Sequence, residues 1–453
     1  MRRTGGTRDM TKGSIALQIL LFSLPLMLGN TFQMLYNTVD VYVVGNYVGT
    51  QALAAVGSTT MITNMAVFFF NGVSVGASVL IARYFGANDP ERLHTAVQTT
   101  MATTFVCSLL FSLAGAALVK PMLHLMATPE DVMDDAVHYL TIYFLGISGL
   151  LIYNMGSGIL RAVGDTTRPL MFLVLTSMLN ILLDLVFVLW LNAGIAGVAY
   201  ATILSQAISA LLVLLLLTRT REIYRMRWRE LRIDFTVLRQ ILKIGLPAGV
   251  QSVITAFSNV FVQSYINFFG SSCMAGWSCY NKLDQFIMLP MQSMAIAATT
   301  FVSQNLGARK VKRANQGTVI TIGMALTVTG LIALLLYIYA EPAVRLMTDD
   351  ESVVAFGALF LHANVFFLIL NCVNHVLAGA LRGRGNSQAP MIIMLLSFVA
   401  IRQIYLFIVT RFIANTPILV GYGYPVGWTC CCIIECTYFF LYLKRRSAPA
   451  IQT

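Results

Sequence analysis

The sequence predicts an all-α polytopic membrane protein, with twelve transmembrane helices arranged in two pseudo-symmetric six-helix bundles. Two observations lead to this fold class: an apolar composition and an internal repeat. Hydrophobic residues make up 57% of the 453 residues and charged residues only 11%. So few charges could not cover the surface of a soluble protein of this size.

Twelve apolar stretches are long enough to cross a bilayer, which takes about 20 residues. The first follows MRRTGGTRDMTKGS directly, without the short apolar core and cleavage site of a signal peptide, so we expect it to be retained. The expected spans are 15–44, 52–81, 95–119, 136–160, 168–191, 194–218, 238–268, 273–303, 316–340, 354–380, 389–412 and 416–443.

Most of the 30 Lys and Arg residues fall on one side of this predicted topology. They include the N-terminal Arg2 and Arg3, the 219–243 segment and the Lys444-Arg445-Arg446 tail, so both termini are expected in the cytoplasm. The net charge of +11 therefore indicates topology and attraction to anionic lipids, and we expect no nucleic-acid partner. The eight cysteines show no disulfide or zinc spacing, and no metal site is predicted.

An offset of about 221 residues aligns one half of the chain with the other. "LRAVGDTTRP" (160–169) matches "LRGRGNSQAP" (381–390), and "LPLMLGNTFQMLYN" (24–37) lies over "LPAGVQSVITAFSN" (246–259). We therefore expect an N-terminal lobe at 1–218, a cytoplasmic linker at 219–237 and a C-terminal lobe at 238–453. Many secondary transporters consist of two such bundles that rock around a shared cleft.

Polar residues follow one face of two spans in the first half. Helical spacing aligns Asn30, Gln33, Asn37 and Asp40 in the first span, and Ser177, Asn180 and Asp184 in the fifth. These faces should turn inward, because polar groups that face lipid find no partner. Asn154 in the fourth span and Thr202 in the sixth are expected to join them.

The two carboxylates occur in the first half alone, since the repeat places Val262 and Tyr405 at the equivalent positions. A scaffold needed equally by both halves would appear in both, so the asymmetry favours a specific task for Asp40 and Asp184. Two facing carboxylates in a low dielectric cannot both ionise without a large free-energy cost, so the pair can take up and release protons. Alternatively, both residues cap a water-filled vestibule or join helices by hydrogen bonds.

The sequence also offers a candidate hinge and candidate residues for the wall of the substrate cleft. Pro25, with Pro247 as its repeat mate, interrupts helical hydrogen bonding and is a candidate hinge, with a static kink as the alternative. An adaptable cleft wall is expected from Gln33 and Asn37 together with Met34, Met171 and Met178, although Met side chains in a bundle often serve packing alone.

Four ionisable residues in the second half need partners inside the membrane. Lys282, Asp284, Arg402 and Glu435 are expected to form interhelical charge pairs, and a direct part in transport is the alternative.

The motifs taken together resemble the multidrug and toxic compound extrusion (MATE) family. The likeness covers essentially the whole chain, in "NTVDVYVVGNYVGTQALAAVG", "ARYFGAND", "RAVGDTTRP", "NILLDLVFV" and "SQNLGARK". The resemblance implies twelve helices in two lobes and no enzymatic activity. It also implies multidrug efflux by antiport, in which amphipathic, often cationic organic compounds leave in exchange for protons, or for sodium as the alternative.

Within the family the chain is most similar to the DinF branch, whose coupling site lies in the first lobe. Carried over by residue, that site implies Asp40, Asn180, Asp184 and Thr202, with Asn154 nearby. The NorM branch has acidic residues in the seventh and tenth helices, where this chain offers amides and a histidine. The resemblance also implies a monomer in the plasma membrane of a prokaryote, with small organic substrates and membrane lipids as partners and no cofactor beyond the coupling ion.

Three other functions are compatible with a polytopic membrane protein, and the sequence argues against each. A lipid or lipid-linked sugar flippase of the same superfamily would favour a cleft lined by cations, whereas the first lobe offers carboxylates. A major-facilitator transporter would carry a glycine-and-arginine signature in its second loop, which the sequence lacks. A membrane enzyme would need a cluster of His, Cys or Asp with nucleophile or metal spacing, and no such cluster is evident.

Overall fold

The computed structural model describes residues 7–126 and 128–447, and these residues form helices and connections without a strand. Twelve helical runs are long and apolar enough to cross a membrane. The predicted fold class, an all-α protein with twelve transmembrane helices, is therefore confirmed. Arg2 and Arg3, which contributed to the predicted topology, lie outside the described residues.

The first six spans are built from six α-helices, two of which end in a π-helical turn. Their bounds are α1 (Ile15–Val43) with η1 (Val44–Val48), α2 (Thr50–Ala87), α3 (Pro90–Leu125), α4 (Glu130–Ala162), α5 (Thr167–Leu185) with η2 (Val186–Trp190), and α6 (Gly194–Arg219).

The remaining spans are more interrupted, because π-helical and 3-10 turns divide the tenth and eleventh. A short turn η3 (Trp228–Glu230) precedes α7 (Phe235–Asn267), α8 (Ser271–Gly307), α9 (Val311–Ile338), α10 (Ala340–Arg345), α11 (Glu351–Asn364), η4 (Val365–Phe367), α12 (Leu368–Gly383), α13 (Gln388–Met394), η5 (Leu395–Ile401), α14 (Arg402–Ile408), η6 (Val409–Ile413), α15 (Pro417–Gly421) and α16 (Gly423–Ser447).

The chain forms two compact units whose boundaries fall inside helices. Unit 1 contains the residues up to Asp9 together with Leu24–Gly249, and unit 2 contains Met10–Ser23 together with the chain from Val250 onward. The expected lobes at 1–218 and 238–453 differ from these units in two places. The start of α1 belongs to unit 2, and the start of α7 belongs to unit 1.

Glycine contacts explain why the start of α7 belongs to unit 1. A Cβ added at Gly72 of α2 would lie 2.2 Å from the backbone nitrogen of Gly249, and one added at Gly76 would lie 2.6 Å from that of Gly245. Each helix thus presents two glycines four residues apart, the small-residue spacing that lets membrane helices approach closely. No side chain larger than hydrogen fits between the two backbones at these points.

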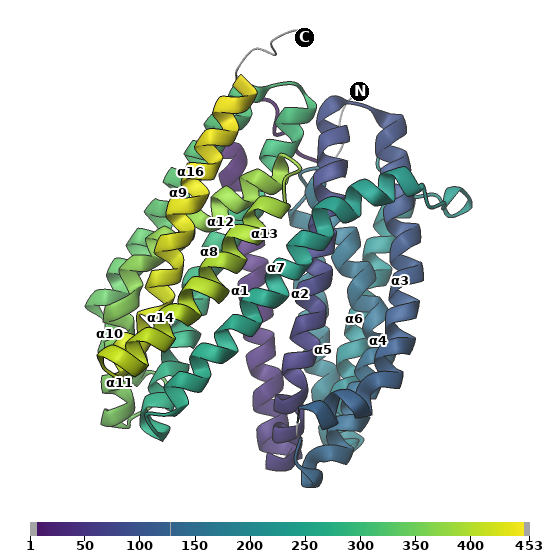
Figure 1. Ribbon diagram of the computed structural model, residues 1–453. Helices are drawn as coiled ribbons and strands as arrows, with labels where there is room; N and C mark the ends of the chain where they lie inside the picture. Colours follow the sequence, from purple (N-terminus) through teal and green to yellow (C-terminus); the bar gives the residue numbers. More distant parts are fainter. Residues whose placement is uncertain (1–6, 127, 448–453) are drawn as a thin grey trace. The chain divides into compact units, whose positions relative to one another are not determined.

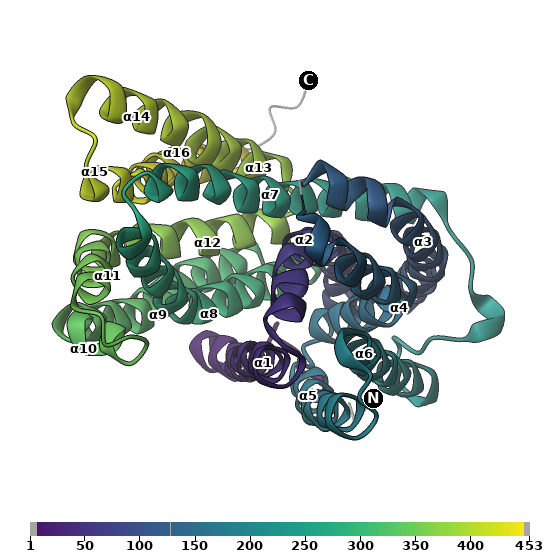
Figure 2. The same ribbon diagram turned by 90° about the horizontal axis from the view of Figure 1, so that it is seen from below.

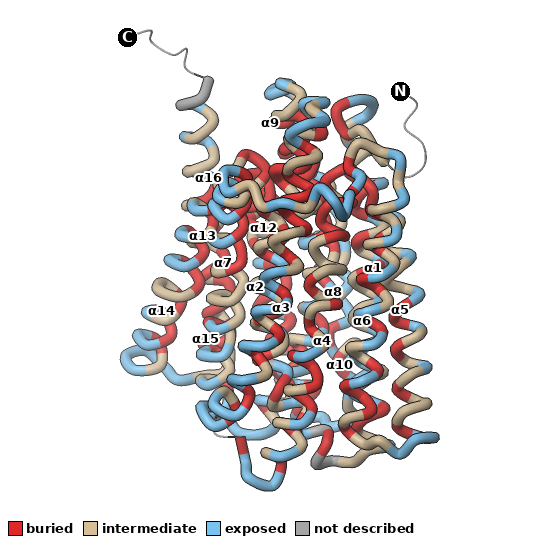
Figure 3. Tube along the Cα trace, turned by 90° about the vertical axis from the view of Figure 1, so that its right-hand side faces the viewer, coloured by how far each residue is buried: buried red, intermediate tan, exposed pale blue. Residues whose placement is uncertain are grey.

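Unit 1 is organised around α4, which packs against α2, α3 and α6. Figure 2 shows α4 between α3 and α6, and Figure 1 shows these helices running side by side. Close approach again depends on glycine, because a Cβ at Gly146 of α4 would lie 2.4 Å from the side chain of Ile203 in α6. This packing buries one face of each helix, and along α5 in Figure 3 buried and exposed residues alternate.

Unit 2 is organised around α8, which packs against α9, α11 and α12, while α12 also contacts α16. Aromatic rings fill its interior. The ring of Trp277 lies 4.8 Å from that of Phe360, 4.9 Å from that of Tyr280 and 5.4 Å from that of Tyr424, measured between ring centres.

The motif "SQNLGARK" positions the start of the described chain within unit 2. Gln304 accepts a hydrogen bond from the backbone nitrogen of Met10 at 3.0 Å, and Asn305 donates to the Met10 carbonyl at 3.2 Å. Lys310 donates to the carbonyl of Thr11 at 2.9 Å. This motif therefore has a structural role that its sequence pattern did not reveal.

The connection between α6 and α7 is folded onto unit 1 and protrudes at the right of Figure 1. Tyr224 is 0% exposed and Met226 is 1% exposed, and the backbone nitrogen of Met226 donates to the carbonyl of Leu217 at 2.8 Å. The hydroxyl of Tyr224 accepts a hydrogen bond from Arg168 at 3.4 Å, and Arg168 also pairs with Asp165 at 3.4 Å. The linker is thus an ordered platform rather than a flexible tether.

Candidate functional site

The carboxyl groups of Asp40 on α1 and Asp184 on α5 lie within hydrogen-bonding reach of each other inside unit 1. Asp184 is 0% exposed, whereas Asp40 is half-buried. Beyond this mutual contact, both oxygens of Asp184 and one oxygen of Asp40 lack a hydrogen-bond partner among the described residues. The two helices therefore bring the acids together in a sheltered place.

The chemistry of this contact follows from the groups themselves. A carboxylate oxygen only accepts hydrogen bonds, so two carboxyl groups can bond to each other only when one carries a proton. Two charged forms at this distance would repel each other strongly away from water. The arrangement can therefore hold one shared proton, release it, or exchange it for another cation.

Tyrosines on two helices surround the pair, and sequence reasoning missed them. Tyr139 of α4 lies within electrostatic range of both acids, and its ring stacks on that of Tyr143 with 6.4 Å between the ring centres. Tyr36 of α1 lies near Asp40 and is hydrogen-bonded to Gln33. A tyrosine in an apolar span is indistinguishable by pattern from an aromatic packing residue, so only the polar stripe on α1 could have pointed toward Tyr36.

The other predicted coupling residues differ in how close they come to the pair. Asn180 lies one turn from Asp184 on α5, is 4% exposed, and its side-chain oxygen has no partner among the described residues. Thr202 donates its hydroxyl to the carbonyl of Val198 in its own helix at 2.9 Å, which leaves only its lone pairs for a ligand. Asn154 stands fifteen residues beyond Tyr139 on α4, a rise of about 22 Å, so it is not brought to the pair.

The predicted cleft residues separate into two groups. On α1, Gln33 and Met34 are half-buried and Asn37 is exposed, all within two turns of Asp40. On α5, Met171 and Met178 are 62% and 61% exposed, and helical geometry places them to one side of the face that carries Asp184. At about 100° per residue, Met178 and Met171 lie about 120° and 140° around the helix from Asp184, so their place in a substrate cleft stays a prediction.

Pro25 lies inside α1 next to the point where the chain passes from unit 2 to unit 1. Its repeat mate Pro247 lies inside α7, close to the corresponding passage at Gly249. Each proline removes one helical hydrogen bond where a helix changes units.

The four ionisable residues of the second half form no ion pairs with one another among the described residues. Lys282 is exposed. Arg402 is 1% exposed, donates to Asn259 at 3.0 Å, and stacks over the rings of Tyr424 and Phe398. The expected charge pairs are therefore wrong, because aromatic faces and an amide take the place of a carboxylate around this guanidinium.

The two carboxylates of this group are equally unpaired. Glu435 is 0% exposed, one of its oxygens accepts a hydrogen bond from the thiol of Cys431 at 3.9 Å, and Arg382 lies within electrostatic range. One oxygen of Asp284 is buried without a hydrogen-bond partner among the described residues.

Comparison with known proteins supplies the context of this arrangement. The sequence model of the MatE family matches residues 25–186 and again residues 247–408, once in each repeat. A relative from Bacillus subtilis (strain 168), the probable multidrug resistance protein YpnP, is 31% identical over 93% of this chain and 95% of its own. A second, the probable multidrug resistance protein YoeA from the same organism, is 26% identical over 98% of each chain.

A solved structure described as the outward-facing conformation of a multidrug resistance MATE family transporter superposes with a TM-score of 0.92. It covers 98% of this chain and 100% of its own, at 22% sequence identity. At that identity the likeness concerns the fold.

Proposed function

Because the chain belongs to the MatE family and is a transporter rather than an enzyme, we propose that it exports amphipathic, often cationic organic compounds in exchange for protons. The observation that supports this most is the close approach of the Asp40 and Asp184 carboxyl groups in a sheltered part of unit 1. In this proposal, both units alternate between two access states, and the carboxyl pair binds its proton in one state and loses it in the other.

Inward movement of protons and outward movement of the organic cation are coupled because both compete for the same negative charge. The deprotonated pair attracts a cationic compound, and protonation from outside removes that attraction. Exchange of one proton for one monocation moves no net charge, so one pH unit supplies roughly 1.4 kcal/mol, or about a tenfold gradient. A second proton per cycle would add roughly 2.3 kcal/mol per 100 mV of membrane potential.

Sodium is the rival coupling ion, since unpartnered oxygens of Asp184 and Asn180 are suitable ligands for a hard cation. Efflux that depends on sodium at fixed pH would favour it. Efflux driven by an imposed pH gradient in sodium-free buffer would favour the proton.

Pro25 is proposed as the hinge of α1, because it weakens the helix beside the passage between units. Asn180 and Thr202 stay candidates for coupling, and Gln33, Asn37, Met34, Met171 and Met178 stay candidates for substrate contact. Membership in the DinF branch, a monomeric state, a prokaryotic plasma membrane location and cytoplasmic termini remain part of the same proposal.

The deciding experiment is efflux from proteoliposomes or an efflux-deficient host with Asp40→Asn and Asp184→Asn. Asp134→Asn, at an exposed position near the start of α4, is the matched control for the same chemical change. We expect pH-driven efflux to be lost in the two site variants and kept in the control. Unchanged pH-driven efflux in the variant with both substitutions would refute the proposed coupling role.

A further inference from the structure

A second site of different chemistry lies in the ordered linker between α6 and α7. A shallow surface cavity of about 400 Å³ is lined there by residues of the linker and by the first turns of α3. Its size falls in the range of small-molecule sites. Three arginines, Arg221, Arg225 and Arg227, contribute to the lining, together with His94.

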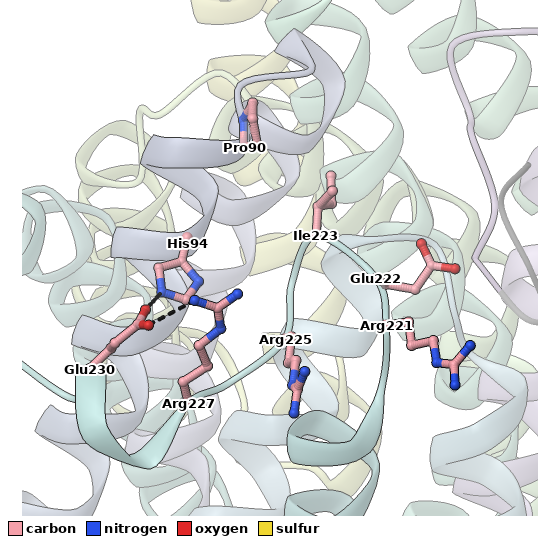
Figure 4. Close-up of a pocket in the computed structure, with 8 residues that line it drawn as sticks. All are labelled: Pro90, His94, Arg221, Glu222, Ile223, Arg225, Arg227 and Glu230. Atoms are coloured by element: carbon pink, nitrogen blue, oxygen red, sulfur yellow. Dashed lines mark hydrogen bonds and ion pairs between the residues drawn. The ribbon is translucent and has the colours of Figure 1, made fainter. Parts of the chain in front are cut away.

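One of the two acidic residues that line this cavity is already engaged. Glu230 accepts a hydrogen bond from Arg227 at 2.7 Å and contacts the ring of His94 at 2.6 Å. Figure 4 shows these three side chains gathered together, with Arg225 and Arg221 pointing away from them. Glu230 therefore neutralises Arg227 and leaves the other two arginines to the cavity.

Arg221 and Arg225 have no carboxylate within ion-pair distance in the part of the chain that the structure describes. Glu222, the second acid of the rim, points away from Arg225 in Figure 4. The Nε atom of Arg225 donates to the carbonyl of Thr218 at 2.9 Å, which fixes the side chain and leaves its two terminal nitrogens available. A fixed guanidinium of this kind suits bidentate recognition of a phosphate.

Trp228, which follows Arg227 in the linker, indicates that the cavity lies near the membrane surface. Trp228 is 57% exposed, and its ring stacks on Phe105 with 5.6 Å between the ring centres. Phe105 belongs to α3, one of the twelve membrane-spanning helices. An exposed tryptophan flanked by arginines and held against a spanning helix is typical of the headgroup region of a bilayer.

We propose that this cavity binds the phosphate of an anionic phospholipid headgroup, with Arg221 and Arg225 as its ligands and Trp228 as the adjoining interfacial anchor. The site is independent of Asp40 and Asp184 and of the coupling ion. The proposed site differs from general attraction between the basic linker and anionic lipids. Only two of the linker's arginines contact the phosphate, so a single lipid is bound at a defined place.

The test uses the full-length protein, reconstituted in vesicles of equal parts phosphatidylcholine and phosphatidylglycerol and then extracted in a neutral detergent. Mass spectrometry measures which lipid stays bound. We expect phosphatidylglycerol to be enriched over phosphatidylcholine. Arg221→Gln and Arg225→Gln should each weaken the enrichment about fivefold, the effect of one lost cation at an anionic surface.

Arg229→Gln is the matched control, because Arg229 is exposed in the same linker but does not line the cavity. An equal loss in Arg229→Gln would show attraction by total charge alone and would overturn the site. Equal retention of both lipids would also overturn it, as would displacement of the lipid by an equal concentration of free glycerol phosphate. Arg225→Lys, which keeps the charge but not the two-pronged donor, should fall between wild type and Arg225→Gln.

Discussion

Gly72 of α2 and Gly249 of α7 meet backbone to backbone, so that a Cβ on Gly72 would stand 2.2 Å from the nitrogen of Gly249. This contact makes the first part of α7 a member of unit 1 and brings a proline-containing helix into that unit's core.

Gly72→Ala should therefore destabilise the protein by about 1–3 kcal/mol, because the two helices must move apart to admit one methyl group. Gly57→Ala in the same helix is the control, since a Cβ there meets nothing within 4 Å. That change should be neutral or stabilising by about 0.5–1 kcal/mol through helix propensity. Thermal unfolding of both variants in detergent measures the difference, and equal unfolding temperatures would contradict the close packing.

The shared-proton arrangement of Asp40 and Asp184 predicts non-additive effects on transport. Each single Asn substitution should lower pH-driven efflux at least about tenfold, the consequence of a 1.4 kcal/mol change at the proton site. The double variant should be no worse than the more damaging single variant, because the residues act as a unit. Initial efflux rates at a series of imposed pH gradients give the comparison. Independent effects that multiply would indicate two separate sites.

Asp165 predicts a pH dependence of stability outside the membrane spans. Burial raises the pKa of this carboxyl above its usual value, although a hydrogen bond from the Arg168 backbone and the Arg168 charge oppose the rise. A raised pKa means that the folded state favours the protonated form, so stability from this group is complete below the unfolded pKa and is lost as the pH rises through the folded pKa.

Asp165→Asn should thus be more stable than wild type at neutral pH and equal to it in acid, where Asp165 is protonated. Unfolding temperatures of both proteins across that pH range provide the measurement. A wild type that is more stable than Asp165→Asn at neutral pH, and that loses this advantage as the pH falls, would show that the ion pair with Arg168 outweighs the burial of the carboxyl.

At Arg402 we expect the conservative substitution by Lys to destabilise the protein more than substitution by Met. Arg402→Lys keeps a buried charge but loses the planar stacking on Tyr424 and the hydrogen bond to Asn259, so it should cost about 3 kcal/mol or more. Arg402→Met removes the charge and can pack on the same rings, so its cost should stay below about 1.5 kcal/mol. Chemical denaturation ranks the two variants, and the reverse order would assign Arg402 an electrostatic partner.

The sequence was sufficient for features that depend on composition and helical spacing. Asp40 and Asp184 were found because each ends a polar stripe in an apolar span, and such a stripe has one stable orientation. Tyr139 and Tyr143 were missed because aromatic residues suit both packing and a polar site.

Features that depend on tertiary contact could not be read from the pattern. The charges of Arg402 and Glu435 suggested interhelical ion pairs. In the structure, aromatic rings lie against Arg402 and a thiol contacts Glu435. Likewise, the charged linker suggested a lobe boundary, whereas Gly245 and Gly249 extend the first unit past it. Such outcomes depend on how closely particular backbones approach.

The sharing of α1 and α7 between the units has a consequence for the gene. A break in the coding sequence at the linker would yield two polypeptides, each missing a strip of its own interior: Phe235–Gly249 would be lost to the first product and Met10–Ser23 to the second. We therefore expect neither fragment to fold alone. Only the continuous chain, or two co-expressed fragments that each supply the helical segment missing from the other's unit, should give folded protein.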